Sequence, residues 1–241
     1  SNDTYGKNQA PLEMDLGGSL AVADFNQDGI AEVYIYNEIF NATTGSKLCD
    51  GGKNGTGKSS TAGAGGTQSI SVAANFDNDN QLELAAGYTI YKVNITNPYG
   101  QTGNTMNPYN IDIGRLADGF TSIADFDEDG VLDVAVSGGG FTQLFPPINI
   151  DLYGYTLKNN NTQLLFTTND SPSARYGPIM IDYLNNKINF FIVGVGNIND
   201  TLKNYTYKQA IPIQSNWNLP IFDNSNGTVP TLFDLDGDGN K

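Results

Sequence analysis

The chain has 241 residues, ample for a buried core, and its 39% of hydrophobic and 16% of charged residues favour short strands joined by polar turns. With no histidine and a single cysteine, Cys49, the sequence excludes imidazole-based catalysis, histidine-ligated metals and an internal disulfide framework. The net charge of −14 argues against a nucleic-acid partner, and no apolar run approaches the roughly twenty residues of a membrane helix, so we expect no membrane insertion in this segment.

The first predicted element is a strand–loop–strand unit at residues 19–36, SLAVADFNQDGIAEVYIY. Its loop, 24–32, carries oxygen-bearing side chains at positions 1, 3, 5 and 9 and glycine at position 6, like the opening of an EF-hand loop. Alternate residues direct short oxygen ligands into one concave turn, and the glycine supplies the positive φ that tightens it. The predicted metal ligands are Asp24, Asn26, Asp28 and Glu32, with the backbone carbonyl of Ile30.

A glycine-rich stretch follows at residues 52–59, GKNGTGKS, and matches the phosphate-binding pattern G-x-x-x-x-G-K-[ST]. That pattern holds phosphate where a buried strand leads in and a helix leads out. The flanking segments, NATTGSKLCDG and STAGAGGTQS, predict neither element. We therefore expect a glycine-rich loop between strands or blades, and no nucleotide site.

The strand–loop–strand pattern returns at residues 69–87, 120–138 and 229–241. The second loop, 75–83, offers Asn75, Asp77, Asp79 and Glu83, with the carbonyl of Gln81. The third loop, 125–133, offers Asp125, Asp127, Asp129 and Asp133, with the carbonyl of Val131. The last loop, 234–241, offers Asp234, Asp236 and Asp238 and stops before its ninth position.

A weaker copy at residues 178–194 has a degenerate loop, 182–190. Leu184 stands there in place of an acid and Lys187 in place of glycine, so we expect no metal in it.

The repeat period is about fifty residues, because the five loops begin at Asp24, Asn75, Asp125, Asp182 and Asp234. That period is the length of one blade of a β-propeller. The sequence therefore predicts an all-β fold, a propeller of four-stranded antiparallel blades forming one domain over residues 1–241, with about four or five blades present. We expect this chain to be part of a larger, for example seven-bladed, propeller, or to be completed by a further copy.

Fourteen of the 26 acidic residues lie in the four acidic loops, which hold no Lys or Arg before Lys241. Such crowded carboxylates repel one another unless a cation lies between them. An all-oxygen ligand set without His or Cys favours Ca²⁺ over Mg²⁺, so the sequence predicts three to four structural Ca²⁺ sites. The alternative interpretation is ordinary turn chemistry, for which Asp, Asn and Gly are common.

The strings ADFNQDGIAEVYI and ADFDEDGVLDVAV resemble FG-GAP (VCBS-type) repeats, the blades of the integrin α-subunit propeller and of many microbial surface proteins. The resemblance implies a propeller with Ca²⁺ in its hairpin loops that serves adhesion or recognition outside the cell. Two features depart from the family. Glu32 and Glu83 stand where it usually has Asp, and the GAP tripeptide is replaced by AAGY at residues 85–88 and SGGG at 137–140.

These patterns together favour a non-enzymatic, extracellular or cell-surface module that binds a protein or glycan, or that builds a scaffold with further copies or the rest of a longer chain. N-x-[ST] sequons add candidate glycosylation sites. They are Asn41, Asn54, Asn94, Asn160, Asn199, Asn204 and Asn226. The alternative is a carbohydrate-active propeller, a polysaccharide lyase or glycosidase, which needs two carboxylates at a shared cleft. The acids outside the loops include Glu13, Asp15, Glu38, Asp112, Asp118 and Asp151, and no spacing singles out a pair.

Overall fold

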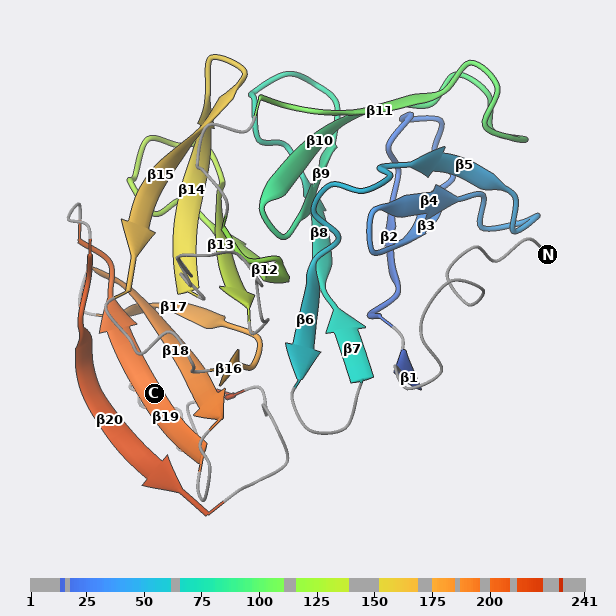
Figure 1. Cartoon of the computed structure of the whole chain (residues 1–241). Coiled ribbons are helices and arrows are strands. Elements are labelled where there is room, and N and C mark those ends of the chain that lie inside the picture. Colours follow the sequence, from blue (N-terminus) through green and yellow to red (C-terminus); the bar gives the residue numbers. More distant parts are fainter. Residues whose placement is uncertain are drawn as a thin grey trace, which may run out of the picture.

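The computed structural model describes residues 14–15, 18–61, 66–110, 116–138, 152–168, 175–184, 187–195, 200–208, 212–222 and 230–231. Every regular element within these ranges is a β-strand, and the strands form five sheets (Figure 1). The all-β prediction is confirmed. The described part of the chain contains no helix of the length and apolar character that a membrane crossing requires.

Three sheets are four-stranded antiparallel meanders, in which each strand pairs with the next along the chain. The first sheet comprises β2 (Ala21–Ala23), β3 (Glu32–Ile35), β4 (Glu38–Phe40) and β5 (Lys47–Asp50). The second comprises β8 (Ser71–Ala74), β9 (Glu83–Ala86), β10 (Thr89–Asn94) and β11 (Thr105–Pro108). The third comprises β12 (Gly119–Ala124), β13 (Asp133–Gly138), β14 (Leu152–Lys158) and β15 (Asn161–Thr167).

The fourth sheet has five strands, because β16 and β17 both pair with β18. Its members are β16 (Arg175–Tyr176), β17 (Met180–Leu184), β18 (Lys187–Val195), β19 (Asp200–Thr206) and β20 (Ser215–Ile221). A small additional sheet joins β6 (Lys58–Thr61), β7 (Gly66–Ser69) and β1 (Met14–Asp15), and β1 runs parallel to β7.

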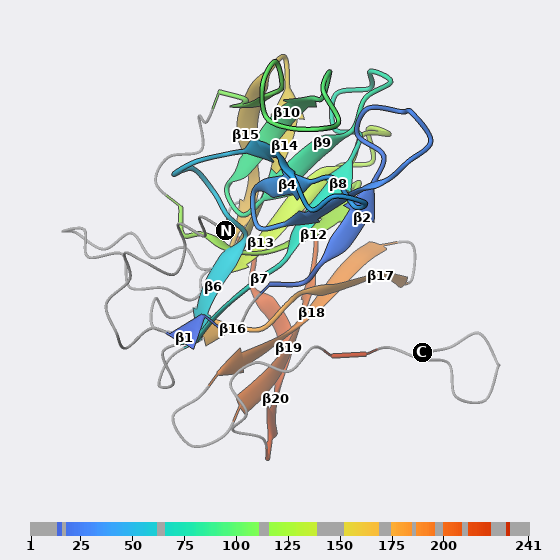
Figure 2. The same ribbon diagram turned by 90° about the vertical axis from the view of Figure 1, so that its right-hand side faces the viewer.

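The four larger sheets lie side by side in chain order (Figure 1), and the first three overlap along the line of sight in the turned view of Figure 2. Each of the three junctions between neighbouring sheets is filled by a cluster of buried apolar side chains. One phenylalanine from the acidic loop of the preceding sheet lies in each cluster, with relative exposures of 2%, 0% and 1% for Phe25, Phe76 and Phe126. The side chain of the second residue thus anchors each of these three loops at the junction between two sheets.

The degenerate copy folds differently from the loop predicted at residues 182–190. Strands β17 and β18 stay paired as far as Leu184 and Lys187, so Asp182 lies in a strand opposite Asn189. Without the alternating acids and the glycine that shape an open turn, backbone pairing continues into a short hairpin. Most of residues 182–190 are therefore strand.

The glycine-rich stretch leads directly into β6, which begins at Lys58, so a strand follows it, as the sequence indicated. The backbone N–H groups of this stretch donate to a carboxylate of the same chain, that of Asp118. The carboxylate of Asp118 accepts hydrogen bonds from the backbone N–H groups of Thr56 (2.8 Å) and Gly57 (3.1 Å) and from the Thr56 hydroxyl (2.6 Å). The Lys58 ammonium lies over the Tyr36 ring, 4.3 Å from its centroid. These hydrogen bonds connect the glycine-rich loop, which leads into the small sheet, to the segment preceding β12.

Replacing Asp118 by alanine leaves these partly buried donors without an acceptor. Because each unsatisfied buried donor costs about 1–3 kcal/mol, we expect Asp118→Ala to lower the free energy of unfolding by about 3 kcal/mol. Urea denaturation followed by circular dichroism measures this change. Asn107→Ala, at an exposed strand position, is the control. Equal stability of the two variants would contradict this role for Asp118.

Candidate metal sites

The first residue of each acidic loop organises the backbone of the turn. In the first loop, the Asp24 carboxylate accepts the N–H groups of Asp28 (3.1 Å) and Gly29 (2.9 Å). In the third loop, Asp125 accepts the equivalent pair, from Asp129 (3.0 Å) and Gly130 (2.9 Å). Both glycines have positive φ, 86° and 89°, as the pattern requires.

The fourth loop residue also takes the left-handed conformation, which the sequence pattern does not indicate. The φ angles are 59°, 61° and 59° at Gln27, Asn78 and Glu128. In the second loop, the side-chain oxygen of Asn75 accepts the N–H of Asn78 (2.8 Å), and its amide donates to the carbonyl of Asp79. Asn75 stands where the other two loops have aspartate. It accepts the N–H group of the fourth loop residue, whereas Asp24 and Asp125 accept those of the fifth and sixth residues.

The ninth loop residue is a buried carboxylate at the start of the second strand. Glu32, Glu83 and Asp133 are 4%, 0% and 0% exposed. Each accepts the N–H group of the buried loop phenylalanine, at 2.9, 2.9 and 2.8 Å for Phe25, Phe76 and Phe126. Glutamate and aspartate therefore make the same contact, and the departure of Glu32 and Glu83 from the family pattern leaves this anchor intact.

Two loops gather their carboxylates into groups that could hold a metal ion. Asp77, Asp79 and Glu83 form one group, and Asp125, Asp127 and Asp133 form the other, with one oxygen of each residue lying within 4.8 Å of the others. Two ligands at about 2.3–2.6 Å from a Ca²⁺ ion lie no more than about 5 Å apart, so this spacing fits calcium coordination.

Other predicted ligands serve the turn itself. The N–H groups of the seventh residues donate to the fifth-position carboxylates, at 2.8, 2.6 and 3.0 Å for Ile30, Gln81 and Val131. Asn26 in the first loop accepts the N–H of Asp28 at 3.0 Å. The first loop does not appear among the carboxylate groups found in the described residues. Asp234, Asp236 and Asp238 lie outside those residues.

Three buried carboxylate oxygens in the two groups have no hydrogen-bond partner, namely Glu83 Oε1, Asp127 Oδ1 and Asp133 Oδ1. A buried, unpaired carboxylate oxygen is costly, and a bound cation supplies the missing partner. Burial raises the pKa of Glu83 to about 7, and the neighbouring Asp77 and Asp79 add to this rise. Burial likewise raises the pKa of Asp133 to about 6. These groups resist carrying charge unless a cation is present.

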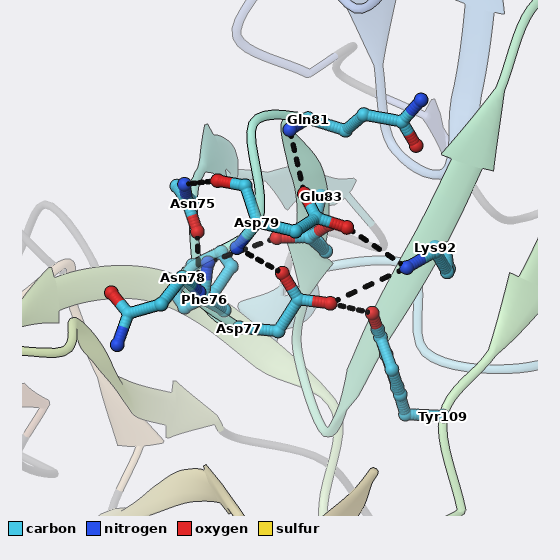
Figure 3. A network of polar contacts seen from close by, with 9 residues as sticks. All are labelled: Asn75, Phe76, Asp77, Asn78, Asp79, Gln81, Glu83, Lys92 and Tyr109. Atoms are coloured by element: carbon cyan, nitrogen blue, oxygen red, sulfur yellow. Dashed lines mark hydrogen bonds and ion pairs between the residues drawn. The ribbon is translucent and has the colours of Figure 1, made fainter.

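Two lysines on neighbouring strands, and Tyr109 just after β11, also reach these groups, which sequence reasoning missed. The Lys92 ammonium lies 3.0 Å from Asp79 Oδ2 and 3.4 Å from Asp77 Oδ2. Figure 3 draws these ion pairs as dashed lines. The Tyr109 hydroxyl donates to Asp77 Oδ2 at 2.7 Å. Burial alone would raise the pKa of Asp77, but the Tyr109 hydrogen bond, the Asp79 N–H and Lys92 together hold it below its usual range.

The third loop has a corresponding partner in Lys158. Its ammonium lies 2.9 Å from Asp127 Oδ2 and 3.3 Å from Asp129 Oδ2. Lys92 follows the ninth-position acid of its loop closely in the sequence, whereas Lys158 follows Asp133 only after a long connection. No fixed spacing could therefore have identified both lysines.

The candidate glycosylation sites differ in exposure. Asn94 and Asn160 are exposed, whereas Asn41 and Asn54 are half-buried. The Asn41 amide donates to the carbonyl of Pro98 at 2.8 Å. Asn204 is 5% exposed. Asn199 and Asn226 lie outside the described residues.

Among the described residues outside the loops, three side chains considered for chemistry, Cys49, Glu38 and Asp118, are buried or engaged by other groups. Burial raises the pKa of the Cys49 thiol to about 12, which keeps it protonated at neutral pH. Of the acids considered for glycan chemistry, Glu38 pairs with Lys47 at 2.5 Å, and Asp118 is held by the glycine-rich loop. The side chains of Glu13, Asp15, Asp112 and Asp151 lie outside the described residues.

A comparison of the chain with protein-family models, curated proteins and solved structures finds no match in any of the three. The sheets and loops themselves define an all-β protein with two acidic clusters that could hold a metal ion.

In metal-free protein the raised pKa of Glu83 makes stability depend on pH. Its folded pKa, about 7, exceeds its ordinary value of 4.5, so the folded state binds the proton more tightly. The stabilisation that protonated Glu83 gives the folded state is complete below the unfolded pKa and is lost as pH rises through the folded pKa. In EDTA, we expect the melting temperature of the wild type to fall relative to Glu83→Gln between about pH 5 and pH 7.5.

Saturating calcium should remove this trend, because the cation favours the charged carboxylate. Glu128→Gln, which alters an exposed acid of the third loop, is the control. Parallel profiles of melting temperature against pH for the wild type and Glu83→Gln would contradict the assignment.

Proposed function

We propose that the chain is a calcium-stabilised segment of an FG-GAP-type β-propeller that serves outside the cell as a recognition or scaffold module. The observation that carries this proposal is the set of buried, unpartnered carboxylate oxygens within the acidic groups of the second and third loops. Ordinary acidic turns expose their carboxylates to water and leave no such oxygens.

The arrangement of the sheets supports a propeller. Four sheets follow one another along the chain with apolar junctions between them, and the first strands β8 and β12 lie close together, with β12 also against β17. The Thr121 N–H donates to the carbonyl of Ile70 at 3.1 Å, and the Ser122 hydroxyl donates to the carbonyl of Ile179 at 3.1 Å. Convergence of the first strands is what blades arranged around a common axis require.

The ligand chemistry supports calcium. The two groups offer only oxygen atoms, and the three carboxylates of each are more than Mg²⁺ usually takes from a protein. Asp127 and Asp133, with Asp125, would hold the ion in the third loop, and Asp77, Asp79 and Glu83 in the second. The proposal extends to the first and last loops, which share the sequence pattern.

The place of the loops supports a structural role for the metals. Each loop joins the first and second strands of its sheet and is fastened by a phenylalanine between two sheets. A cation that fixes the turn also fixes this junction, so metal binding and folding are linked. The remaining loops are left to contact a protein, a glycan or further copies of the chain.

Removal of metal should therefore destabilise the protein. We expect EDTA to lower the melting temperature markedly and added Ca²⁺ to restore it, as measured by differential scanning calorimetry. Asp127→Ala removes one ligand of the third site and should reduce the stabilisation by Ca²⁺. Asp50→Ala, which removes an acid outside the loops, should preserve it. A melting temperature that is the same in EDTA and in Ca²⁺ would exclude structural calcium.

A recognition module should bind without turnover. We expect a subset of ligands on glycan and extracellular-protein arrays to retain the chain in Ca²⁺ and to release it in EDTA. Assays for new reducing ends and for unsaturated uronates on the bound glycans should stay at background. Appearance of either product would instead establish the lyase or glycosidase alternative.

A further inference from the structure

Two lysines reach the acidic groups from different positions on equivalent strands. Lys92 lies on β10 directly opposite Glu83, the ninth-position acid of the second loop. Lys158 lies at the end of β14, beyond the part of that strand that pairs with β13. Both strands are the third of their sheets, and both ammonium groups end between the third- and fifth-position carboxylates of the adjacent loop. Two different backbone positions thus deliver the same charge to the same place.

The lysines contact residues that a metal would use. Asp77 Oδ2 and Asp127 Oδ2 each belong to a residue of an acidic group, and each lies within ion-pair distance of an ammonium. Interaction with the carboxylates raises the pKa of both lysines, so both remain charged at neutral pH. The ammonium leaves Glu83 Oε1 and Asp133 Oδ1 without a hydrogen-bond partner, so it compensates the group only in part.

The first loop supplies an internal contrast. The lysine nearest to it in the sequence among the described strands, Lys47, pairs with Glu38 (2.5 Å) and Asp50 (3.1 Å), neither of which belongs to an acidic loop. Within the described residues no lysine forms an ion pair with the acids of the first loop.

We propose that Lys92 and Lys158 are built-in counter-cations that compete with a divalent ion and so set the affinity of the second and third loops for it. In the absence of metal, each ammonium offsets the repulsion among the carboxylates and holds the loop in shape. When a divalent ion binds, it must share or displace the ammonium, which lowers the net gain on binding. The lysine side chains are 47% and 40% exposed, so they can move into solvent when displaced.

This inference rests on the proposed metal binding and refines it. Exposed ion pairs contribute modestly, so each lysine should alter affinity by a small factor and not abolish binding. With the lysines present, the loops would then bind calcium at higher calcium concentrations than without them. Such tuning suits a module whose metal content varies with the medium.

The test uses Lys92→Met and Lys158→Met, which keep the apolar stem and remove the charge. Calcium titration calorimetry on protein freed of metal with EDTA should show one site in each variant binding roughly three- to tenfold more tightly. In EDTA, the melting temperature of each variant should fall below that of the wild type, and in saturating calcium the deficit should disappear. Lys92→Arg and Lys158→Arg keep the charge and should bind calcium like the wild type.

Lys47→Met is the matched control, because Lys47 also bridges two carboxylates, outside the loops. It should leave calcium affinity unchanged and alter the melting temperature equally in EDTA and in calcium. The same behaviour in Lys92→Met and Lys158→Met would overturn the inference and leave metal binding intact. A wild type that releases no heat on titration and melts identically in EDTA and calcium would overturn the proposed function as well.

Discussion

The fold depends on a carboxylate buried at the start of the second strand in each described acidic loop. One oxygen of Glu32, Glu83 or Asp133 accepts the N–H group of the loop phenylalanine, whose ring fills the junction with the next sheet. The turn, the strand pairing and the contact between sheets therefore share one anchor. Because burial raises the pKa of all three carboxylates, a positive charge close by favours their ionised form.

That requirement explains how the loops differ from one another. The second and third loops place an ammonium beside their third- and fifth-position acids, yet Glu83 Oε1 and Asp133 Oδ1 still lack a partner. A lysine donates from one direction only, whereas a calcium ion is surrounded by six to eight oxygens and can reach all members of the group together. If the groups bind metal as proposed, the lysine and the ion would be partial substitutes, and the balance between them would decide how far each sheet depends on metal.

The sequence predicted the all-β fold and the grouping of acids in the second and third loops, because these features come from short-range alternation and a regular period. It could not predict Lys92, Lys158 or Tyr109 as partners, since the packing of the sheets brings them to the loops over irregular distances along the chain. It also placed a loop at 182–190, where continued pairing up to Leu184 and Lys187 forms a hairpin. A local sequence pattern therefore forms an open turn only where its side chains hydrogen-bond the backbone groups that strand pairing would otherwise satisfy.

Asp118 shows how this chain satisfies a buried carboxylate by its own means. Both of its oxygens are occupied: Oδ2 accepts the N–H and hydroxyl groups of Thr56, and Oδ1 accepts the N–H groups of Gly57 and Gly119. Glu83 is more deeply buried than Asp118, yet one of its oxygens has no partner. The glycine-rich loop therefore needs no external ion, while the acidic loop lacks the amide groups to complete its shell. The same physical requirement thus makes one loop self-sufficient and directs the other towards a cation.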